Sequence, residues 1–406
     1  MESKKQGFDI KTVKACLTKI KQEITAVDAV NTLMLLCLFI FYTLTFFVPK
    51  FYGMTEKYVG VFVFVILAVI SVVNINPVKK LKEKDKDLIA LIALAVIAAI
   101  NIVIVDSGYG CFFVVTNFAL ICYLSSHIPF HRWQLYLFGG LYTLMIIYWF
   151  FGVYTWMFAD YTSFAMNTNT AATFTVFSMM YVLVFFEELY RKNRTAGLII
   201  TIALVKCLQI SLYHRSRGAF IMLGAFLVLR FIVPKKLWAK KAFYNAVCIF
   251  ATLGSLVFVA VYILVGTSGV NFRMPFFYKN IFSGREAIWL EFWNLFKKSP
   301  LTGIGTNVTI TSFFEYNVHN AMYNILVIHG VIVFALVLFL LYRNWNGCRG
   351  NASLPGASAC AFIALMAVCI ESFFDVDLIW TDYSVNALLL MLTANMRPAE
   401  EDEHRG

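Results

Sequence analysis

The chain has 406 residues, of which 60% are hydrophobic, 17% are aromatic and only 14% are charged. This composition excludes a soluble globular protein, in which about 25% of residues are charged. The formal net charge of +11 does not indicate nucleic-acid binding, because the basic residues gather in alternate connections between apolar segments. These segments are close to the bilayer-spanning length of about 20 residues, so they predict an all-α, polytopic membrane protein.

The N-terminal segment, residues 1–30, is expected to lie on the cytoplasmic side. Apolar side chains recur at three- and four-residue spacing over residues 8–27, with lysines on the opposite face. This pattern favours an amphipathic helix on the inner surface of the membrane, against anionic lipid. A partly ordered, solvated tail is the alternative.

The rest of the chain alternates apolar segments with polar connections and predicts about twelve transmembrane helices. Their ranges are 31–49, 58–76, 88–105, 109–125, 134–152, 171–189, 195–212, 218–234, 243–265, 319–342, 355–374 and 380–396. Helices 1–9 occupy residues 31–265 and helices 10–12 occupy residues 319–396. Between them lies one long loop, 266–318, and residues 397–406 form a tail.

The distribution of lysine and arginine sets the orientation of these helices. Basic residues are concentrated in the N-terminal tail and in alternate connections, at 76–87, 191–194, 233–241 and 343–349. The positive-inside rule makes these connections, and both termini, cytoplasmic. The loop at 266–318 would then lie outside the cell. A loop this long in a compact chain is usually functional, so we expect it to cover an active site.

Arg215 and Arg217 lie on the outer side in this topology, where the insertion rule disfavours positive charge. Arg217 begins a predicted helix in the sequence Ser-Arg-Gly-Ala. Unpaired backbone N–H groups and the helix dipole favour a phosphate there, and the guanidinium group offers planar, bidentate donors. An arginine that only anchors the helix end is the alternative.

Arg285 begins a predicted helix inside the long loop. Ser283 and Glu286 have the spacing of a capping box, which would make Ser283 the N-cap. Arg285, Trp289 and Trp293 then share one face at four-residue spacing. This aromatic face could contact a sugar or a lipid, or could only float the helix on the membrane.

His319 and Asn320 open the tenth predicted transmembrane helix, next to the long loop. An imidazole at this place could act as a base or as a hydrogen-bond donor. A purely structural histidine is the alternative. Asn169, before the sixth helix, belongs to a polar cluster with Asn167 on the same side.

Weaker signals surround these residues. Gly303 and Gly305 suggest a tight loop, although a lone G-x-G is weak evidence. Lys206 and Glu371 lie inside predicted helices, where charges usually find partners, so a mutual ion pair is possible. An acidic group, Asp375, Asp377 and Asp382, is expected to form a solvated turn; it could instead orient an arginine, bind a hydroxyl group or coordinate a cation. The cysteines lie singly, and no spacing predicts a metal site.

Taken together, these motifs resemble the bacterial O-antigen ligase/polymerase superfamily. The resemblance rests on Ser-Arg-Gly-Ala at 216–219, Ser-Gly-Arg with Ile-Trp at 283–289, Gly-Ile-Gly at 303–305 and His-Asn at 319–320, in that order. The segment around Asn167 and Asn169 is similar to an asparagine-containing motif of that family. The motifs cover residues 165–325, whereas the first five predicted helices match only in hydropathy.

The resemblance implies a metal-independent glycosyltransferase without a cofactor, in the bacterial cytoplasmic membrane. Its donor would be a glycan on undecaprenyl diphosphate, held by Arg217 and Arg285, with His319 assisting transfer. Arg215, Asn169, Trp289, Asn320, Gly303 and Gly305 are the candidate substrate-binding residues. We expect a polymerase that joins repeat units of a capsular or surface polysaccharide.

Two alternatives remain open from the sequence. A ligase would move the whole glycan to a lipid or cell-wall acceptor. A transporter or flippase of a lipid-linked anion is more distant, because internal repeats and charges near the bilayer midplane would be expected of it. Membrane lipids are expected partners in every case.

Overall fold

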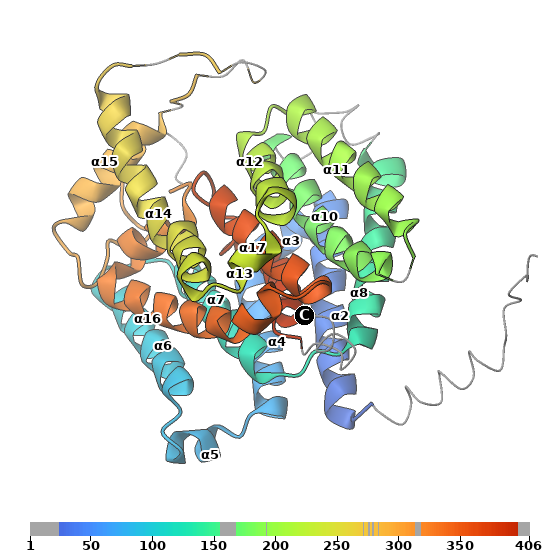
Figure 1. Ribbon diagram of the computed structural model, residues 1–406. Helices are drawn as coiled ribbons and strands as arrows, with labels where there is room; N and C mark the ends of the chain where they lie inside the picture. Colours follow the sequence, from blue (N-terminus) through green and yellow to red (C-terminus); the bar gives the residue numbers. More distant parts are fainter. Residues whose placement is uncertain are drawn as a thin grey trace, which may run out of the picture.

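The computed structural model describes residues 24–396 except 155–167, 192, 271, 275, 276, 278, 279, 283 and 313–317. Most of the predicted amphipathic segment 8–27 therefore lies outside the described residues, as do Asn167 and Ser283. The described chain folds into a bundle of helices without a named β-strand, and Arg273 and Asn280 form an isolated antiparallel bridge. The predicted all-α class is confirmed (Figure 1).

The helices up to the long loop are α2 (Ala26–Phe47), α3 (Pro49–Thr55), η1 (Glu56–Tyr58), α4 (Val59–Asn74), α5 (Pro77–Lys82), α6 (Lys86–Ile104), α7 (Gly110–His127), α8 (Arg132–Tyr148), η2 (Trp149–Val153), α10 (Thr168–Tyr190), α11 (Ala196–Tyr213), α12 (Arg217–Leu227), η4 (Val228–Ile232), α13 (Lys235–Trp238) and α14 (Lys241–Thr267). The loop contains α15 (Arg285–Phe296). The chain ends with α16 (Ala321–Ala352), α17 (Ala357–Glu371), η5 (Thr381–Tyr383) and α18 (Ser384–Ala394).

Each of the twelve predicted segments forms a helix, but they differ in length. Within the described chain, 9 helical segments are long and apolar enough to cross a membrane. The segments predicted at 218–234, 355–374 and 380–396 form shorter helices, α12 with η4, α17 and α18. Length and composition therefore make this a multi-pass membrane protein.

The bundle has two chemically different ends. We call the end that carries α15, the start of α12 and the start of α16 the loop end. The opposite end carries α5 and the connections at 191–195 and 233–241, and we call it the basic end. In Figure 1, α15 lies at the top left and α5 at the bottom.

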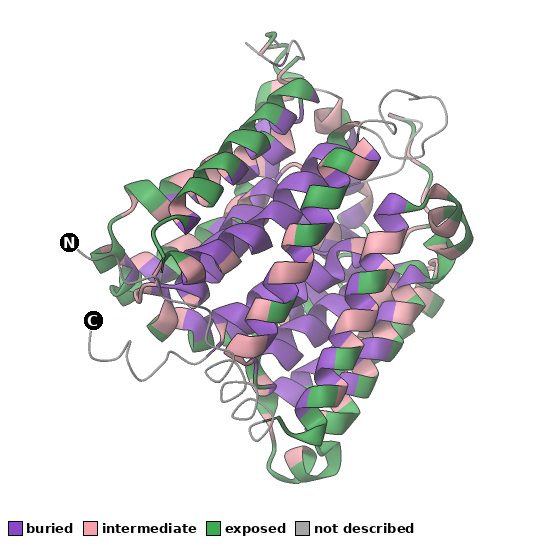
Figure 2. Ribbon diagram, turned by 90° about the vertical axis from the view of Figure 1, so that its right-hand side faces the viewer, coloured by how far each residue is buried: buried purple, intermediate pink, exposed green. Residues whose placement is uncertain are grey.

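The surface between the two ends is apolar. Val72 is 75% exposed, Leu264 is 71% exposed, and Val103 and Phe151 are each 82% exposed. Water would penalise such side chains, whereas hydrocarbon tails do not. Figure 2 shows these exposed outer faces around a buried interior.

The interior is built from α10, α17 and α18. α10, α17 and α18 are each buried along almost their whole length. The alanine, serine and cysteine residues of α17 allow close helix packing in a membrane protein. Because neighbouring helices surround α17 and α18, these helices can be short. The irregular chain between them, residues 372–380, is also mostly buried, and such backbone is tolerated at membrane depth only inside protein.

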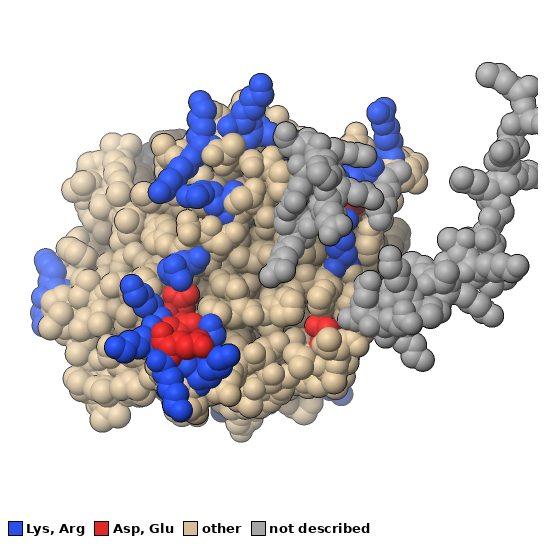
Figure 3. Space-filling model, turned by 60° about the horizontal axis from the view of Figure 1, so that its bottom comes forward, with Lys and Arg blue, Asp and Glu red and all other residues tan. Residues whose placement is uncertain are grey.

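Charged side chains at the basic end pair with one another. Arg343 binds Asp87 through two bonds of 2.8 and 3.2 Å, and Lys80 binds Asp85 at 2.9 Å. Figure 3 shows an acidic patch ringed by lysine and arginine side chains on this face of the molecule. Asp85, Asp87 and His127 offer ligand atoms within 4.8 Å of one another. Since Lys80 and Arg343 already neutralise both carboxylates, this cluster serves as an ion-pair network.

Candidate active site

His319 lies at the loop end, between the long loop and α16. Its backbone has a φ of 50°, in the left-handed region, which few residues other than glycine adopt. The ring approaches Asp375 in the segment after α17, with 3.6 Å between Nδ1 and Oδ1. The two side chains are 29% and 27% exposed, so the pair is accessible from outside the protein.

The charge state of Asp375 is set by opposing effects. Burial raises the pKa of the carboxyl group, but the close approach of His319 and the charges of His319 and Arg285 together hold the pKa below its ordinary value. Asp375 is therefore ionised at neutral pH and can orient the imidazole ring. The sequence prediction of a solvated acidic turn is wrong, because Asp377 is only 7% exposed.

Two predicted substrate-binding residues, Trp289 and Asn320, instead hold His319 in place. Trp289 is fully buried, and its Nε1–H donates to the carbonyl oxygen of Val318 at 2.5 Å. Asn320 is the N-cap of α16 and is also fully buried. Its Nδ2 donates to the carbonyl oxygen of Phe373 at 3.0 Å, and its Oδ1 accepts from Ser255 at 2.8 Å. These bonds fix the backbone on both sides of His319, which makes Trp289 and Asn320 positioning residues.

Arg217 is the first residue of α12. Its Nη1 donates to the carbonyl oxygens of Asn280 and Ile281 at 3.1 and 2.8 Å, which ties the long loop to the helix. Tyr262 of α14 donates to the same Ile281 oxygen at 2.8 Å. Burial lowers the pKa of Arg217, and the nearby positive charge of Arg285 lowers it further. The charge of Arg285 also lowers the pKa of Asp375, which lies beside His319. Because Arg285 is thus near both Arg217 and Asp375, the three predicted catalytic side chains gather at one end of the bundle.

Arg285 is the first residue of α15, as predicted, but the predicted cap is wrong. Gly284 is the N-cap, with a φ of 87° and no side-chain cap. A glycine suits this position because it adopts a left-handed conformation without strain. α15 packs against α14 and α16 through Ile288, Trp289 and Phe292. The predicted exposed aromatic face is reduced to Trp293, which is 40% exposed.

Glu371, the last residue of α17, lies directly beneath the start of α12. The side chain is fully buried, and its Oε1 has no hydrogen-bond partner among the described residues. A Cβ atom on Gly218 would lie 2.6 Å from this oxygen. Ser216 caps the helix by accepting from the backbone N–H of Ala219 at 3.4 Å. Ser216 already accepts from one N–H group at the start of α12, and the Glu371 carboxyl group occupies the space beside Gly218, so a phosphate would depend on the guanidinium groups.

An apolar pocket of about 230 Å³ lies beside Arg217. Its walls come from α12, α14, the chain before α15 and the segment after α17. They are formed by Ile221, Phe258, Val261, Tyr262, Val265, Met274, Ile281, Phe282 and Phe374. Arg217 is its one charged lining residue among those described. A single cation at the edge of an apolar pocket suits an amphipathic anion.

Gly303 and Gly305 pack against an interruption in α16. α16 is interrupted at Gly330, which has a φ of 84°. The chain at 300–305 packs against this interruption. The N–H of Ile304 donates to the carbonyl oxygen of Val327 at 2.9 Å, and the N–H of Gly305 donates to the carbonyl oxygen of Ile328 at 3.1 Å. A Cβ atom on Gly303 would lie 2.3 Å from the carbonyl oxygen of Ile328. The tight loop suggested by these glycines is present, and both are buried in backbone contacts.

The remaining candidates are not among the residues that line the pocket beside Arg217. Arg215 is exposed and has a φ of 51°, and Asn169 is exposed in the first turn of α10. Lys206 does not pair with Glu371: its Nζ donates to Gln209 at 2.9 Å, whereas Glu371 lies against Gly218. Asp375 is the functional candidate to which the sequence assigned no specific partner. Only the folded chain brings it to His319.

Residues 202–340 match the family model Wzy_C, described as O-Antigen ligase. The matched region runs from α11 into α16 and contains Arg217, Arg285 and His319. No curated protein matches the chain. Over residues 202–340, this match supports a relation of the multi-pass membrane protein to the O-antigen ligase/polymerase superfamily.

Proposed function

We propose that the protein transfers a glycan from undecaprenyl diphosphate to an acceptor at the loop end, and that it polymerises repeat units of a capsular or surface polysaccharide. The observation that supports this most is that Arg217, which lines an apolar pocket, lies at the same end of the bundle as Arg285 and the His319–Asp375 pair. This combination fits a ligand with an isoprenoid chain, an anionic diphosphate and a reactive sugar.

The proposed reaction is a displacement at C1 of the donor sugar. An acceptor hydroxyl oxygen attacks C1 while the bond from C1 to the diphosphate oxygen breaks, and the electron pair stays on the diphosphate. Arg217 and Arg285 stabilise the negative charge that develops there, which lowers the barrier when they do so more strongly in the transition state. The mechanism uses no metal ion and no cofactor.

His319 takes the proton of the acceptor hydroxyl group in this mechanism. Asp375 holds the ring in orientation and stabilises the imidazolium ion that forms. Trp289 and Asn320 keep the backbone of His319 fixed. A small displacement of either residue would move the imidazole ring and lower the rate of transfer, although neither residue contacts the substrate.

The orientation belongs to the same proposal. Under the positive-inside rule the basic end lies in the cytoplasm with both termini, and the loop end faces outward from the cytoplasmic membrane. Residues 266–318 would then form the extracytoplasmic unit between two membrane units, 31–265 and 319–396. Residues 1–30 and 397–406 would be cytoplasmic.

The test is a transfer assay with purified protein and a repeat unit on undecaprenyl diphosphate. A ladder of repeat units that stays on undecaprenyl diphosphate is the expected product. A glycan moved whole to a lipid or cell-wall acceptor would make the protein a ligase. Movement of the lipid across vesicles without transfer would overturn the enzyme assignment and favour a transporter.

A further inference from the structure

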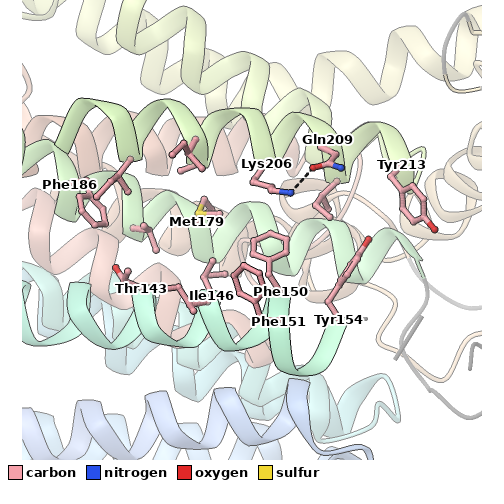
Figure 4. A pocket seen from close by; sticks show the side chains of 16 residues that line it. Thr143, Ile146, Phe150, Phe151, Tyr154, Met179, Phe186, Lys206, Gln209 and Tyr213 are labelled. Carbon is pink, nitrogen blue, oxygen red and sulfur yellow. Dashed lines mark hydrogen bonds between the residues drawn. The ribbon is translucent and has the colours of Figure 1, made fainter. Parts of the chain in front are cut away.

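A second apolar groove opens between α8 with η2, α10 and α11. It has a volume of about 520 Å³ and is lined mainly by isoleucine, phenylalanine, valine and methionine side chains. Figure 4 shows the side chains of these helices facing one another across it. The groove faces the apolar outer surface, since Ile147 and Ile202 on its walls are 49% and 53% exposed.

Lys206 of α11 projects into this groove. Its Nζ donates to Gln209 at 2.9 Å and lies 5.8 Å from the centroid of the Phe150 ring (Figure 4). Lys206 precedes the end of α11 at Tyr213 by about 10 Å, at a rise of about 1.5 Å per residue. The Cα atom of Lys206 is therefore below the loop end, within the apolar surface, and its ammonium group reaches Gln209, about one turn nearer to that end. Among the described residues it forms no ion pair with a carboxylate.

A cation at this depth is costly unless it serves a ligand or reaches the interface. The π-helical turn η2 places Phe150 and Phe151 along the groove, and such turns often occur at functional sites. Tyr154 and Tyr213 line the groove where it reaches the loop end. The groove thus combines a long apolar wall, one cation and two hydroxyl groups, which is the complement of an isoprenoid chain with a phosphate.

The groove is distinct from the pocket beside Arg217. α12 packs against α10 and α11, and it contributes Arg217 and Ile221 to the pocket that it shares with α14. The groove is formed by α8 with η2, α10 and α11, and it shares no lining residue with that pocket. The chain passes from Tyr213 at the groove to Arg217 within four residues. Two apolar sites, each with its own cation, therefore meet at the start of α12.

We propose that the groove binds the isoprenoid chain of the acceptor, with the acceptor phosphate on Lys206. The identity of this lipid rests on the proposed function, in which the donor diphosphate occupies Arg217 and Arg285. Two lipid sites on either side of α12 would bring a lipid-linked acceptor to a lipid-linked donor, which is the arrangement a polymerase needs.

The experiment uses the full chain in phosphatidylcholine nanodiscs and a farnesyl diphosphate probe with a diazirine on its terminal isoprene unit. After irradiation, peptide mapping should place label on α8 with η2 and on α11, and also on the chain beside Arg217. Lys206→Glu should lower the label on α8 and α11 about tenfold, the effect of losing one charge-assisted contact, and should leave the second site labelled. Excess undecaprenyl phosphate should displace the groove label.

Two variants serve as controls. Lys206→Arg keeps the charge and should keep the label, and Lys50→Leu removes an exposed lysine of α3 outside the groove and should have no effect. Label on α8 and α11 that Lys206→Glu does not change would overturn the proposal. So would displacement by dioleoylphosphatidylglycerol as effective as displacement by undecaprenyl phosphate, because the groove would then hold ordinary anionic lipid.

Labelling does not require transfer, so the two proposals fail separately. If the groove label behaves as expected but the purified protein makes no polymer, the polymerase assignment fails and the lipid site remains. If the protein makes polymer and no label reaches the groove, the lipid site fails alone.

Discussion

Both ends of the bundle carry acidic and basic side chains, but these side chains are paired closely at the basic end and less closely at the loop end. At the basic end, acids and bases form close ion pairs. Arg343 donates two hydrogen bonds to Asp87, and Lys80 donates one to Asp85. At the loop end, Arg217 donates to the backbone carbonyl oxygens of Asn280 and Ile281, and the His319–Asp375 contact is 3.6 Å long. Buried oxygens of four acids there, Glu286, Glu371, Asp377 and Asp382, have no hydrogen-bond partner among the described residues.

This difference separates a structural charge network from a candidate site. Close ion pairs lower the cost of charged groups near a membrane and leave little to offer a ligand. Longer or incomplete pairings keep charge available, and perturbed groups in a cleft are typical of functional sites. The predictions below change one end at a time.

The largest effect is expected for His319→Gln. The amide keeps a polar side chain of similar reach but cannot take a proton, so transfer should fall about 10²–10⁴-fold. Transfer from the lipid-linked donor in detergent measures this. Unchanged thermal unfolding would show that the loss is chemical, whereas activity within a few-fold of the wild type would remove His319 from the mechanism.

Arg217→Lys and Arg285→Lys should each lower transfer about 10²–10³-fold despite keeping the charge. Lysine lacks the planar donors that bind two phosphate oxygens at once, so stabilisation of the leaving group is lost. Because Arg217 also ties the loop to α12, its variant needs a parallel measurement of thermal unfolding. Near-normal rates for both variants at normal expression would rule out bidentate binding of the diphosphate.

Asp375→Asn should have a smaller effect on transfer, about 10–10²-fold, because His319 remains but is less well oriented. The lowered pKa of Asp375 also predicts a pH dependence of stability. The pair with His319 stabilises the fold above the ordinary carboxyl pKa of about 4, and this contribution disappears as pH falls through the lower folded pKa. Wild type and variant should thus unfold at different temperatures at pH 7, begin to approach each other below about pH 4, and converge below the folded pKa of Asp375. An equal difference at both pH values would contradict the ion pair.

The smallest effect is expected at the basic end, for Arg343→Lys. The Arg343 side chain is 55% exposed, so losing one of its two bonds to Asp87 should cost less than about 1 kcal/mol in the free energy of unfolding. Transfer should stay within about twofold of the wild type. A loss as large as that of Arg285→Lys would erase the distinction between the two ends.

The site was only partly visible in the sequence. Arg217, Arg285 and His319 could be selected because each begins a helix next to the long loop, and the fold gathers them at one end. Trp289 and Asn320 have the same sequence context, yet they are buried and serve as supports. A motif shows that a position matters, but it does not show whether the side chain faces the substrate or the protein.

The sequence by itself determined the membrane class, the order of the helices and the segment around which the site forms. These features follow from local hydrophobicity, segment length and helix-terminal residues, which neighbouring parts of the chain scarcely alter. The tertiary structure alone decided that Asp375 faces His319, that Glu371 lies under Gly218 rather than beside Lys206, and that three predicted helices are short. Those outcomes depend on contacts between residues far apart in the chain, and a single sequence carries no signal for such contacts.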